Sequence, residues 1–261
     1  MSWNWQSQTC EARKRILVPG TICERPADAS ICNLTFSEST CQEIPNGNRD
    51  IKIGQGDTEA ERRLELIVCT MVAGEEAIAD VGGASVKVKL ESVIRGKELY
   101  EMTDEEKLRL AAEHKERGTC LVMENRFDDA YKRFQKAIRI LVFLGREEEP
   151  QASLFAAVCS NIVLCHLKSN RFDDAILAAN KVLEKKPDNV KVLLRRALAR
   201  QELRDFENAQ QDLLDVLRLE PNNVLATSHL QDIKREISEQ NVRYEDMVKK
   251  MFPFTASKAS T

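Results

Sequence analysis

Hydrophobic and charged residues alternate in short segments of the first hundred residues. In the clearest of them, Val86, Val88 and Leu90 alternate with charged residues. A period of two is typical of a strand with one buried face. Further strands are predicted at 16–18, 30–36 and 50–53, and one helix at 59–72, ended by Gly74. We therefore expect residues 10–96 to form a small, mostly antiparallel sheet with one helix.

After residue 100 the hydrophobic period becomes helical, and the sequence repeats. The segment Asn125–Ala130 recurs at Asn170–Ala175, and a related segment follows at Asp205–Ala209. Pro187 and Pro221 are 34 residues apart. A repeat of 34 residues that contains two helices is typical of tetratricopeptide repeats. We expect three such repeats within residues 97–252, with an extended connection after the first.

A single helical hairpin cannot bury its own hydrophobic face, so the predicted repeats should stack into an array with a concave groove. Small residues at one equivalent position, Ala130, Ala175 and Ala209, would let the two helices of each hairpin approach closely. A last helix over residues 222–252 would cap the array, and the polar tail after it should be frayed. The expected fold is therefore α+β: a sheet domain followed by an all-α array.

Composition and charge narrow the classes of partner. Glycine and proline number only 10 and 7, which favours long helices, and 39 Lys+Arg nearly balance 42 Asp+Glu. This balance argues against a nucleic-acid partner, although it is compatible with a local basic groove. No apolar run approaches the ~20 residues that cross a bilayer. The start of the chain lacks the pattern of a signal peptide. We expect an intracellular protein in the cytoplasm, and also in the nucleus, with no membrane partner.

Cysteine and histidine spacing predicts neither a metal site nor a cofactor. None of the 8 cysteines lies in a Cys-x-x-Cys pair, and the 3 histidines are scattered. Structural zinc sites draw ligand pairs from tight turns. The even number of cysteines would allow disulfides, but without an export signal we favour buried free thiols.

Polar residues on the first helix of each repeat are candidates for a binding site, because that helix would line the concave face. They are Lys115 and Thr119 in the first repeat, Asn161 in the second, and Lys191 and Arg195 in the third. Three cations and an amide facing one groove would suit an anionic peptide with a terminal carboxylate. The alternative is that these side chains are simply solvated on exposed helix faces.

These residues resemble the carboxylate clamp of tetratricopeptide co-chaperones. The similar segments are Lys115–Thr119, Asn161 and Lys191–Arg196, and the linker 97–107 and basic run 247–252 resemble those of large FKBP-type immunophilins. This resemblance implies binding of the acidic tail Met-Glu-Glu-Val-Asp of the ninety-kilodalton heat-shock chaperone. We interpret the last helix as a cap, and calmodulin binding by its basic end is the alternative.

The order of several weaker fragments resembles an FKBP domain over residues 10–96. These fragments are 15–20, 51–56, 71–75 and 84–93. Gly54-Gln55-Gly56 could by itself suggest a phosphate loop, but the further Gly and Lys that such a loop needs are absent.

The polar and aromatic groups of an active FKBP site are missing from this sequence. No Tyr precedes Tyr100, and the segment Phe36–Cys41 lacks the expected Phe-Asp pair. Aliphatic residues at Leu64–Val68 replace the Trp of the helix, and the loop that carries a Tyr is shortened to Glu76–Gly83. We therefore expect no catalytic residues, no prolyl isomerase activity and no macrolide binding.

The leading hypothesis is a non-enzymatic co-chaperone or adaptor whose repeats bind a heat-shock chaperone tail. A client protein would be held by the sheet domain or by the outer repeat surface. The plan resembles that of divergent insect immunophilins, and this resemblance implies a casein-kinase client and a circadian role. The alternatives are a scaffold that binds its client directly, and a prolyl isomerase with a remodelled pocket. Trp3 and Trp5 would form an anchoring arm or part of a partner surface.

Overall fold

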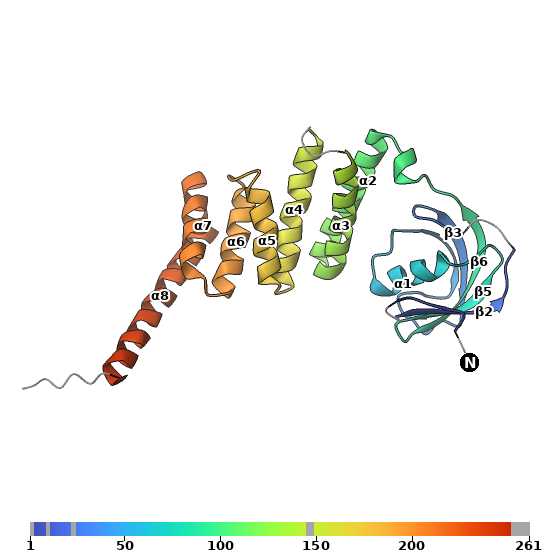
Figure 1. Cartoon of the computed structure of the whole chain (residues 1–261), viewed down its shortest axis with the longest axis horizontal. Helices are drawn as coiled ribbons and strands as arrows, with labels where there is room; N and C mark the ends of the chain where they lie inside the picture. The colour runs from blue at the N-terminus through green and yellow to red at the C-terminus, as the bar shows by residue number, and fades with distance from the viewer. Residues whose placement is uncertain (1–2, 9–10, 22–24, 145–148, 252–261) are drawn as a thin grey trace, which may run out of the picture. The chain divides into compact units, whose positions relative to one another are not determined.

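The computed structural model describes residues 3–8, 11–21, 25–144 and 149–251 (Figure 1). Two compact units divide the chain after Ala111. The first contains the sheet and the start of the first long helix, and the second contains the rest of the helical array from Ala112 onward. Cys10, Cys23, Phe252 and the predicted polar tail lie outside the described residues.

The first unit is one antiparallel sheet of six strands with a helix packed on it. The strand order is β1-β2-β5-β6-β3-β4. In Figure 1 the sheet curves around α1. The bounds are β1 Trp5–Gln6, β2 Ala12–Val18, β3 Ile31–Ser37, β4 Gly47–Lys52, α1 Glu59–Val68, β5 Glu76–Val81 and β6 Ser85–Ile94.

Alternating side chains of the strands and one face of α1 form the core of this unit. Leu34 and Phe36 of β3, Val88 of β6, and Leu64 and Ile67 of α1 are all buried in one cluster. Fully burying a side chain of this kind contributes ~1.5–3 kcal/mol. The predicted α+β fold is thus confirmed, and the period of two predicted the buried positions of β6.

One predicted loop is wrong: Glu76–Gly83 contains the strand β5, which lies between β2 and β6. Two of its inward positions, Ala77 and Ala79, are fully buried but have little intrinsic preference for strands. Pairing with β2 on one side and β6 on the other therefore makes this segment a strand, and its own sequence does not predict one. The helix α1 is also shorter than predicted, since turns follow Val68 before the positive φ of Gly74.

A buried ion pair fastens the end of α1 to the sheet. Lys14 of β2 is 3% exposed and Glu75 is 4% exposed. The Lys14 ammonium donates to Glu75 Oε1 at 2.7 Å and to the Thr70 carbonyl at 3.0 Å. Because desolvating both charges is costly, removal of one partner would leave an uncompensated buried charge.

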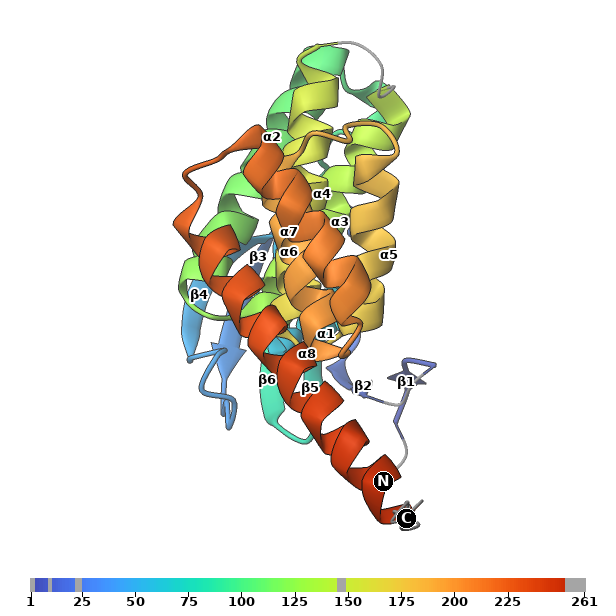
Figure 2. The same ribbon diagram turned by 90° about the vertical axis from the view of Figure 1, so that its left-hand side faces the viewer.

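The second unit is a stack of helical hairpins, followed by one long helix (Figure 2). The bounds are α2 Asp104–Met123, α3 Phe127–Leu144, α4 Gln151–Lys168, α5 Phe172–Leu183, α6 Val190–Glu202, α7 Phe206–Leu219 and α8 Val224–Met251, and the short helix η1 Leu99–Glu101 precedes them. The first helices of the three repeats are α2, α4 and α6, and the second helices are α3, α5 and α7. The distal half of α8 extends past the array.

Small residues allow close packing within each hairpin. A Cβ at Gly118 of α2 would lie 2.6 Å from the Phe134 ring of α3, so this position accepts no side chain without a shift. Ala130, Ala175 and Ala209 are fully buried, as the repeat pattern predicted.

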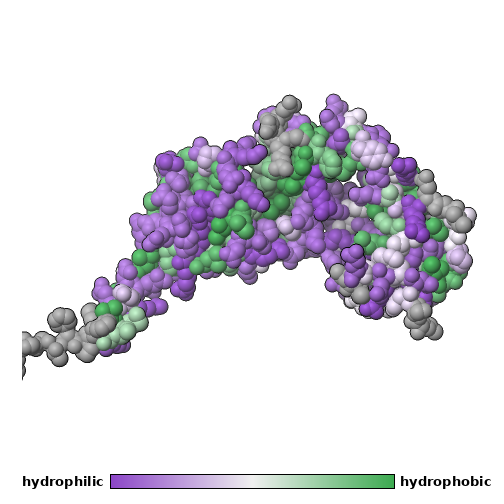
Figure 3. Space-filling view, viewed as in Figure 1, coloured by the Kyte–Doolittle hydropathy of each residue, from purple (hydrophilic) through white to green (hydrophobic). Residues whose placement is uncertain are grey.

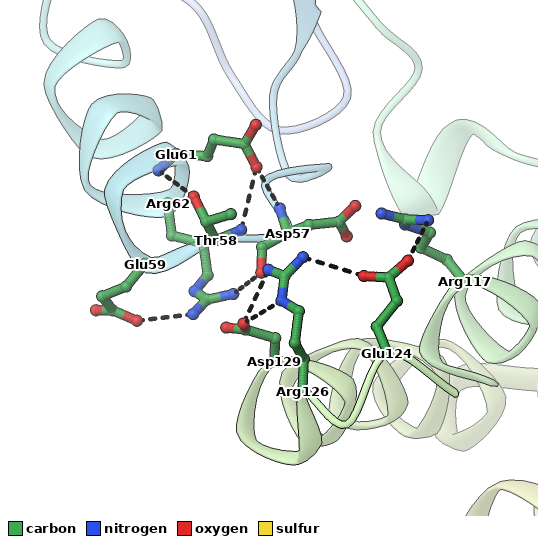
Figure 4. A network of polar contacts seen from close by, with 9 residues as sticks. All are labelled: Asp57, Thr58, Glu59, Glu61, Arg62, Arg117, Glu124, Arg126 and Asp129. Atoms are coloured by element: carbon green, nitrogen blue, oxygen red, sulfur yellow. Dashed lines mark hydrogen bonds and ion pairs between the residues drawn. The ribbon is translucent and has the colours of Figure 1, made fainter. Parts of the chain in front are cut away.

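Local ion pairs and caps fix the helix starts, as Figure 4 shows for α1 and α3. Thr58 and Glu61 form a capping box at the start of α1, in which each side chain accepts a hydrogen bond from the other's backbone N–H. At the start of α3, the Arg126 guanidinium donates to Asp129 at 2.9 Å and to Glu124 at 3.3 Å. These contacts define where the helices begin.

Contrary to the sequence expectation that no apolar run approaches this length, one helix of the described residues, α4, is long and apolar enough to cross a membrane by length and composition. However, α3 and α5 pack against it, and its buried residues include the polar Ser160 and His166. Only 28% of this window is buried in the structure, so packing within the array accounts for only part of its apolar character. The array surface seen in Figure 3 is mostly hydrophilic.

Candidate anion-binding site

The five residues predicted to bind an anionic peptide all lie on first helices of the repeats. Lys115 and Thr119 are on α2, Asn161 is on α4, and Lys191 and Arg195 are on α6. Lys191 is exposed, and the other four are partly buried.

Helices α4 and α6 bring Arg195 into contact with Ser160, the residue before Asn161. The Arg195 guanidinium donates through Nη1 to Ser160 Oγ at 2.7 Å and also to the Ser160 carbonyl. Ser160 directly precedes Asn161, and α4 packs against α6. Lys191 lies one helical turn before Arg195 and therefore on the same face of α6. The structure thus gathers one amide and two cations on two neighbouring helices.

The charge of Arg195 is partly buried without a compensating carboxylate. Within the described parts of the chain, its hydrogen-bond acceptors are both neutral oxygens of Ser160. Burial lowers the pKa of the Arg195 guanidinium, because desolvation disfavours the charged form. A carboxylate brought to this position would offset that cost.

The next arginines along α6 have the opposite character. Arg196 and Arg200 both pair with Asp212 of α7, at 2.6 Å and 2.7 Å, and Asp212 is 1% exposed. Arg196 also donates to Asn180 of α5 at 2.7 Å. These two arginines therefore join α6 to the second helices, whereas Arg195 contacts a first helix.

On α2, Thr119 and Lys115 lie one turn apart, and the Thr119 hydroxyl donates to the Lys115 carbonyl at 2.9 Å. The Thr119 oxygen can still accept a hydrogen bond. The described residues include no carboxylate paired with Lys115. That these two residues and the group on α4 and α6 contact a single peptide stays a prediction.

Two neighbours of Arg195 were not predicted from the sequence. Ser160 is one of them, and its position before Asn161 is the only signal that could have identified it. The other is Cys165, whose pKa burial raises to about 12, while the Arg195 charge acts in the opposite direction. Its thiol is thus a neutral, buried neighbour of the cation.

The segments that would supply a prolyl pocket contribute hydrophobic side chains to the core of the sheet unit. Leu64, Ile67 and Val68 of α1 are at most 1% exposed, and Phe36 of β3 is 2% exposed. Trp5 packs against the edge of this cluster, as expected of an anchoring arm. Among the described residues, no group of three or more His, Cys, Asp and Glu could hold a metal ion.

No family model matches this chain. Curated proteins and solved structures are nevertheless similar to it in sequence or in fold. The chain is 30% identical to mouse FK506-binding protein-like over 246 residues, which cover 92% of this chain and 70% of that protein. It is 34% identical to human peptidyl-prolyl cis-trans isomerase FKBP4 over 173 residues, 63% of this chain and only 38% of that protein. The crystal structure of residues 1–211 of CG17282 aligns with a TM-score of 0.55 at 17% identity, over 65% of this chain and 95% of that one.

Proposed function

This chain belongs to the FKBP-type immunophilins with tetratricopeptide repeats, and from that premise we propose that it is a co-chaperone. Its repeats would bind the acidic C-terminal tail of a heat-shock chaperone. The observation that carries the proposal is Arg195, a partly buried cation that neutral oxygens hold in place. Lys191 lies beside Arg195 on the same face of α6. Asn161 directly follows Ser160, the hydrogen-bond partner of Arg195.

A carboxylate suits this position better than a neutral ligand. Charge-assisted hydrogen bonds are roughly twice as strong as neutral ones, and an arginine can bind a carboxylate with two parallel bonds. Arg195 and Lys191 would hold the carboxylates of the terminal residue, and Asn161 would bind the peptide backbone. Lys115 and Thr119 would add a second anchor from α2.

We further propose that the sheet unit has no prolyl isomerase activity. Twisting a prolyl amide requires an apolar pocket with polar side chains at its edge. In this chain, Leu64 and Ile67 of α1 are packed in the hydrophobic core. No Tyr precedes Tyr100, and α1 contains no Trp. A prolyl-peptide assay would test this directly, and a rate clearly above that of buffer would exclude it.

The client would be held by the sheet unit or by the outer surface of the repeats, and a kinase is our proposed client. We also propose that the protein acts in the cytoplasm and nucleus. Affinity capture from cells followed by mass spectrometry would identify the client. Recovery of the chaperone without any kinase would contradict the proposed client but not the co-chaperone role.

Calorimetry with the peptide Met-Glu-Glu-Val-Asp tests the main proposal. We expect micromolar affinity, about −8 kcal/mol, and much weaker binding of the C-terminally amidated peptide. Arg195→Ala should cost about 2–5 kcal/mol, which weakens binding by about thirtyfold or more. The matched control is Arg218→Ala on the second helix α7, where an exposed arginine pairs with Asp215. Absence of binding to the parent protein would favour a scaffold that binds its client directly.

A further inference from the structure

Ser160 has an unusual environment for a serine in the middle of a helix. It is 7% exposed and lies in the second half of α4. Serine in a helix interior usually points to solvent or bonds back to its own helix. Here its hydroxyl and its carbonyl oxygen both accept from Nη1 of one arginine on another helix.

The two adjacent arginines of α6 use different edges of their guanidinium groups. Arg196 engages Asp212 through Nε and Nη2 and Asn180 through Nη1, so both of its edges are occupied. Arg195 is held through Nη1, and the described residues provide no acceptor for its Nε–Nη2 edge. A guanidinium can form two parallel bonds with a carboxylate through its Nε–Nη2 edge or its Nη1–Nη2 edge, and the Nε–Nη2 edge is the one that leaves the Nη1 bonds to Ser160 in place.

We propose that Ser160 is a positioning residue: it fixes the Arg195 guanidinium so that the Nε–Nη2 edge is presented to a peptide carboxylate. The inference rests on the proposed binding of a carboxylate-terminated peptide. Fixing the side chain before binding reduces the conformational entropy that is lost when the peptide binds. Ser160 therefore increases affinity without touching the peptide.

Nuclear magnetic resonance of the free protein tests the positioning directly. Hydrogen bonding to Ser160 should slow rotation of the Arg195 guanidinium. The signal of this group is identified as the one that disappears in Arg195→Lys. Ser160→Ala should accelerate this rotation, and Ser160→Thr, which keeps the hydroxyl, should restore slow rotation. The signals of Arg196 and Arg200 should not change, because Asp212 holds both.

Affinity for the free-carboxylate peptide provides the second measurement. Loss of one hydrogen bond that orients the arginine should weaken binding by about fivefold in Ser160→Ala. Ser160→Thr should recover most of the affinity. The matched control is Ser169→Ala at the end of α4, whose hydroxyl donates to Asp128 and not to Arg195.

The two proposals fail in different ways. Unchanged rotation of Arg195 in Ser160→Ala would overturn the positioning role, whatever the affinity. If Ser160→Ala accelerates the rotation of Arg195 but leaves the affinity for the peptide unchanged, the role of Ser160 in binding is overturned. If the parent protein does not bind the peptide although Ser160→Ala accelerates rotation, the proposed function fails and the positioning of Arg195 stands.

Discussion

A residue with positive φ ends the first helix of each repeat. Asn125, Asn170 and Arg204 have φ of 60°, 56° and 60°. Asparagine adopts this left-handed conformation more easily than most residues, whereas for other residues with a Cβ it costs roughly 1–2 kcal/mol. The third repeat therefore has a strained turn that the first two avoid.

Arg204→Gly should stabilise the helical unit, because glycine adopts positive φ without this strain. We expect a gain of about 0.5–1 kcal/mol, seen as a higher urea midpoint followed by circular dichroism. Asn170→Ala, at the equivalent position of the second repeat, should lower the midpoint. Equal effects of both substitutions would contradict the strain argument.

His166 makes the stability of the helical unit sensitive to pH. It is buried beside Tyr131, with ring centroids 4.8 Å apart, and its Nδ1 lies 4.0 Å from the Asp174 carboxylate. Burial, and then the Arg171 charge, lower its pKa below 6.5, while the carboxylates of Asp174 and Asp128 act in the opposite direction.

Because this pKa is lower in the folded state, the unfolded chain binds a proton first as pH falls below about 6.5. The contribution of neutral His166 is present above that pH and is lost as pH falls toward the folded pKa. The urea midpoint should therefore decrease between pH 7.5 and 5.5, and less so in His166→Gln. The same decrease in both proteins would contradict this assignment. His229→Gln on α8 is the control for loss of a histidine.

At the scale of elements, Asp212 joins α6 to α7 through two arginines. Its side chain is 2% exposed, and those of Arg196 and Arg200 are 17% and 16% exposed. Asp212→Asn would leave two largely buried cations without a compensating charge. We expect a loss of about 3–5 kcal/mol in the free energy of unfolding, measured with urea.

Asp215→Asn on the same helix is the control for this prediction. Asp215 pairs with an arginine that is 72% exposed, and an exposed pair contributes about 0–1 kcal/mol. Similar costs at Asp212 and Asp215 would show that burial of the ion pair is not the cause.

Helices and strands with a strong hydrophobic period could be predicted from the sequence. Elements whose structure depends on pairing with distant strands could not. The alternation in β6 and the repeat from Phe172 to Phe206 predicted a strand and two helix starts that the structure confirms. The strand β5 was missed, because Ala77 and Ala79 give it little hydrophobic contrast and its two partner strands determine it. Local patterns contain no information about such long-range pairing.

At the scale of the molecule, the net charge of −3 gives no sign of a cationic site. Repeat spacing predicted which helices contain Lys191, Arg195 and Asn161, because equivalent positions of a repeat have equivalent environments. It could not predict that Ser160 contacts Arg195, since these residues are 35 positions apart and meet only when α4 packs on α6. Repeat spacing selected Arg195 and not its neighbour Arg196, but it could not predict that Arg196 pairs with Asp212 of α7.

The residues proposed to bind the peptide, together with Ser160, Cys165 and Asp212, all lie in the second compact unit. A fragment of residues 97–261, which keeps α2 complete, should therefore bind Met-Glu-Glu-Val-Asp within about twofold of the affinity of the full chain, a difference below ~0.5 kcal/mol. A fragment of residues 1–96 keeps the whole core cluster of the sheet and should unfold cooperatively without binding the peptide. Calorimetry on both fragments and on the full chain measures this. A tenfold loss of affinity in a folded 97–261 fragment would mean that the sheet unit contributes to the site.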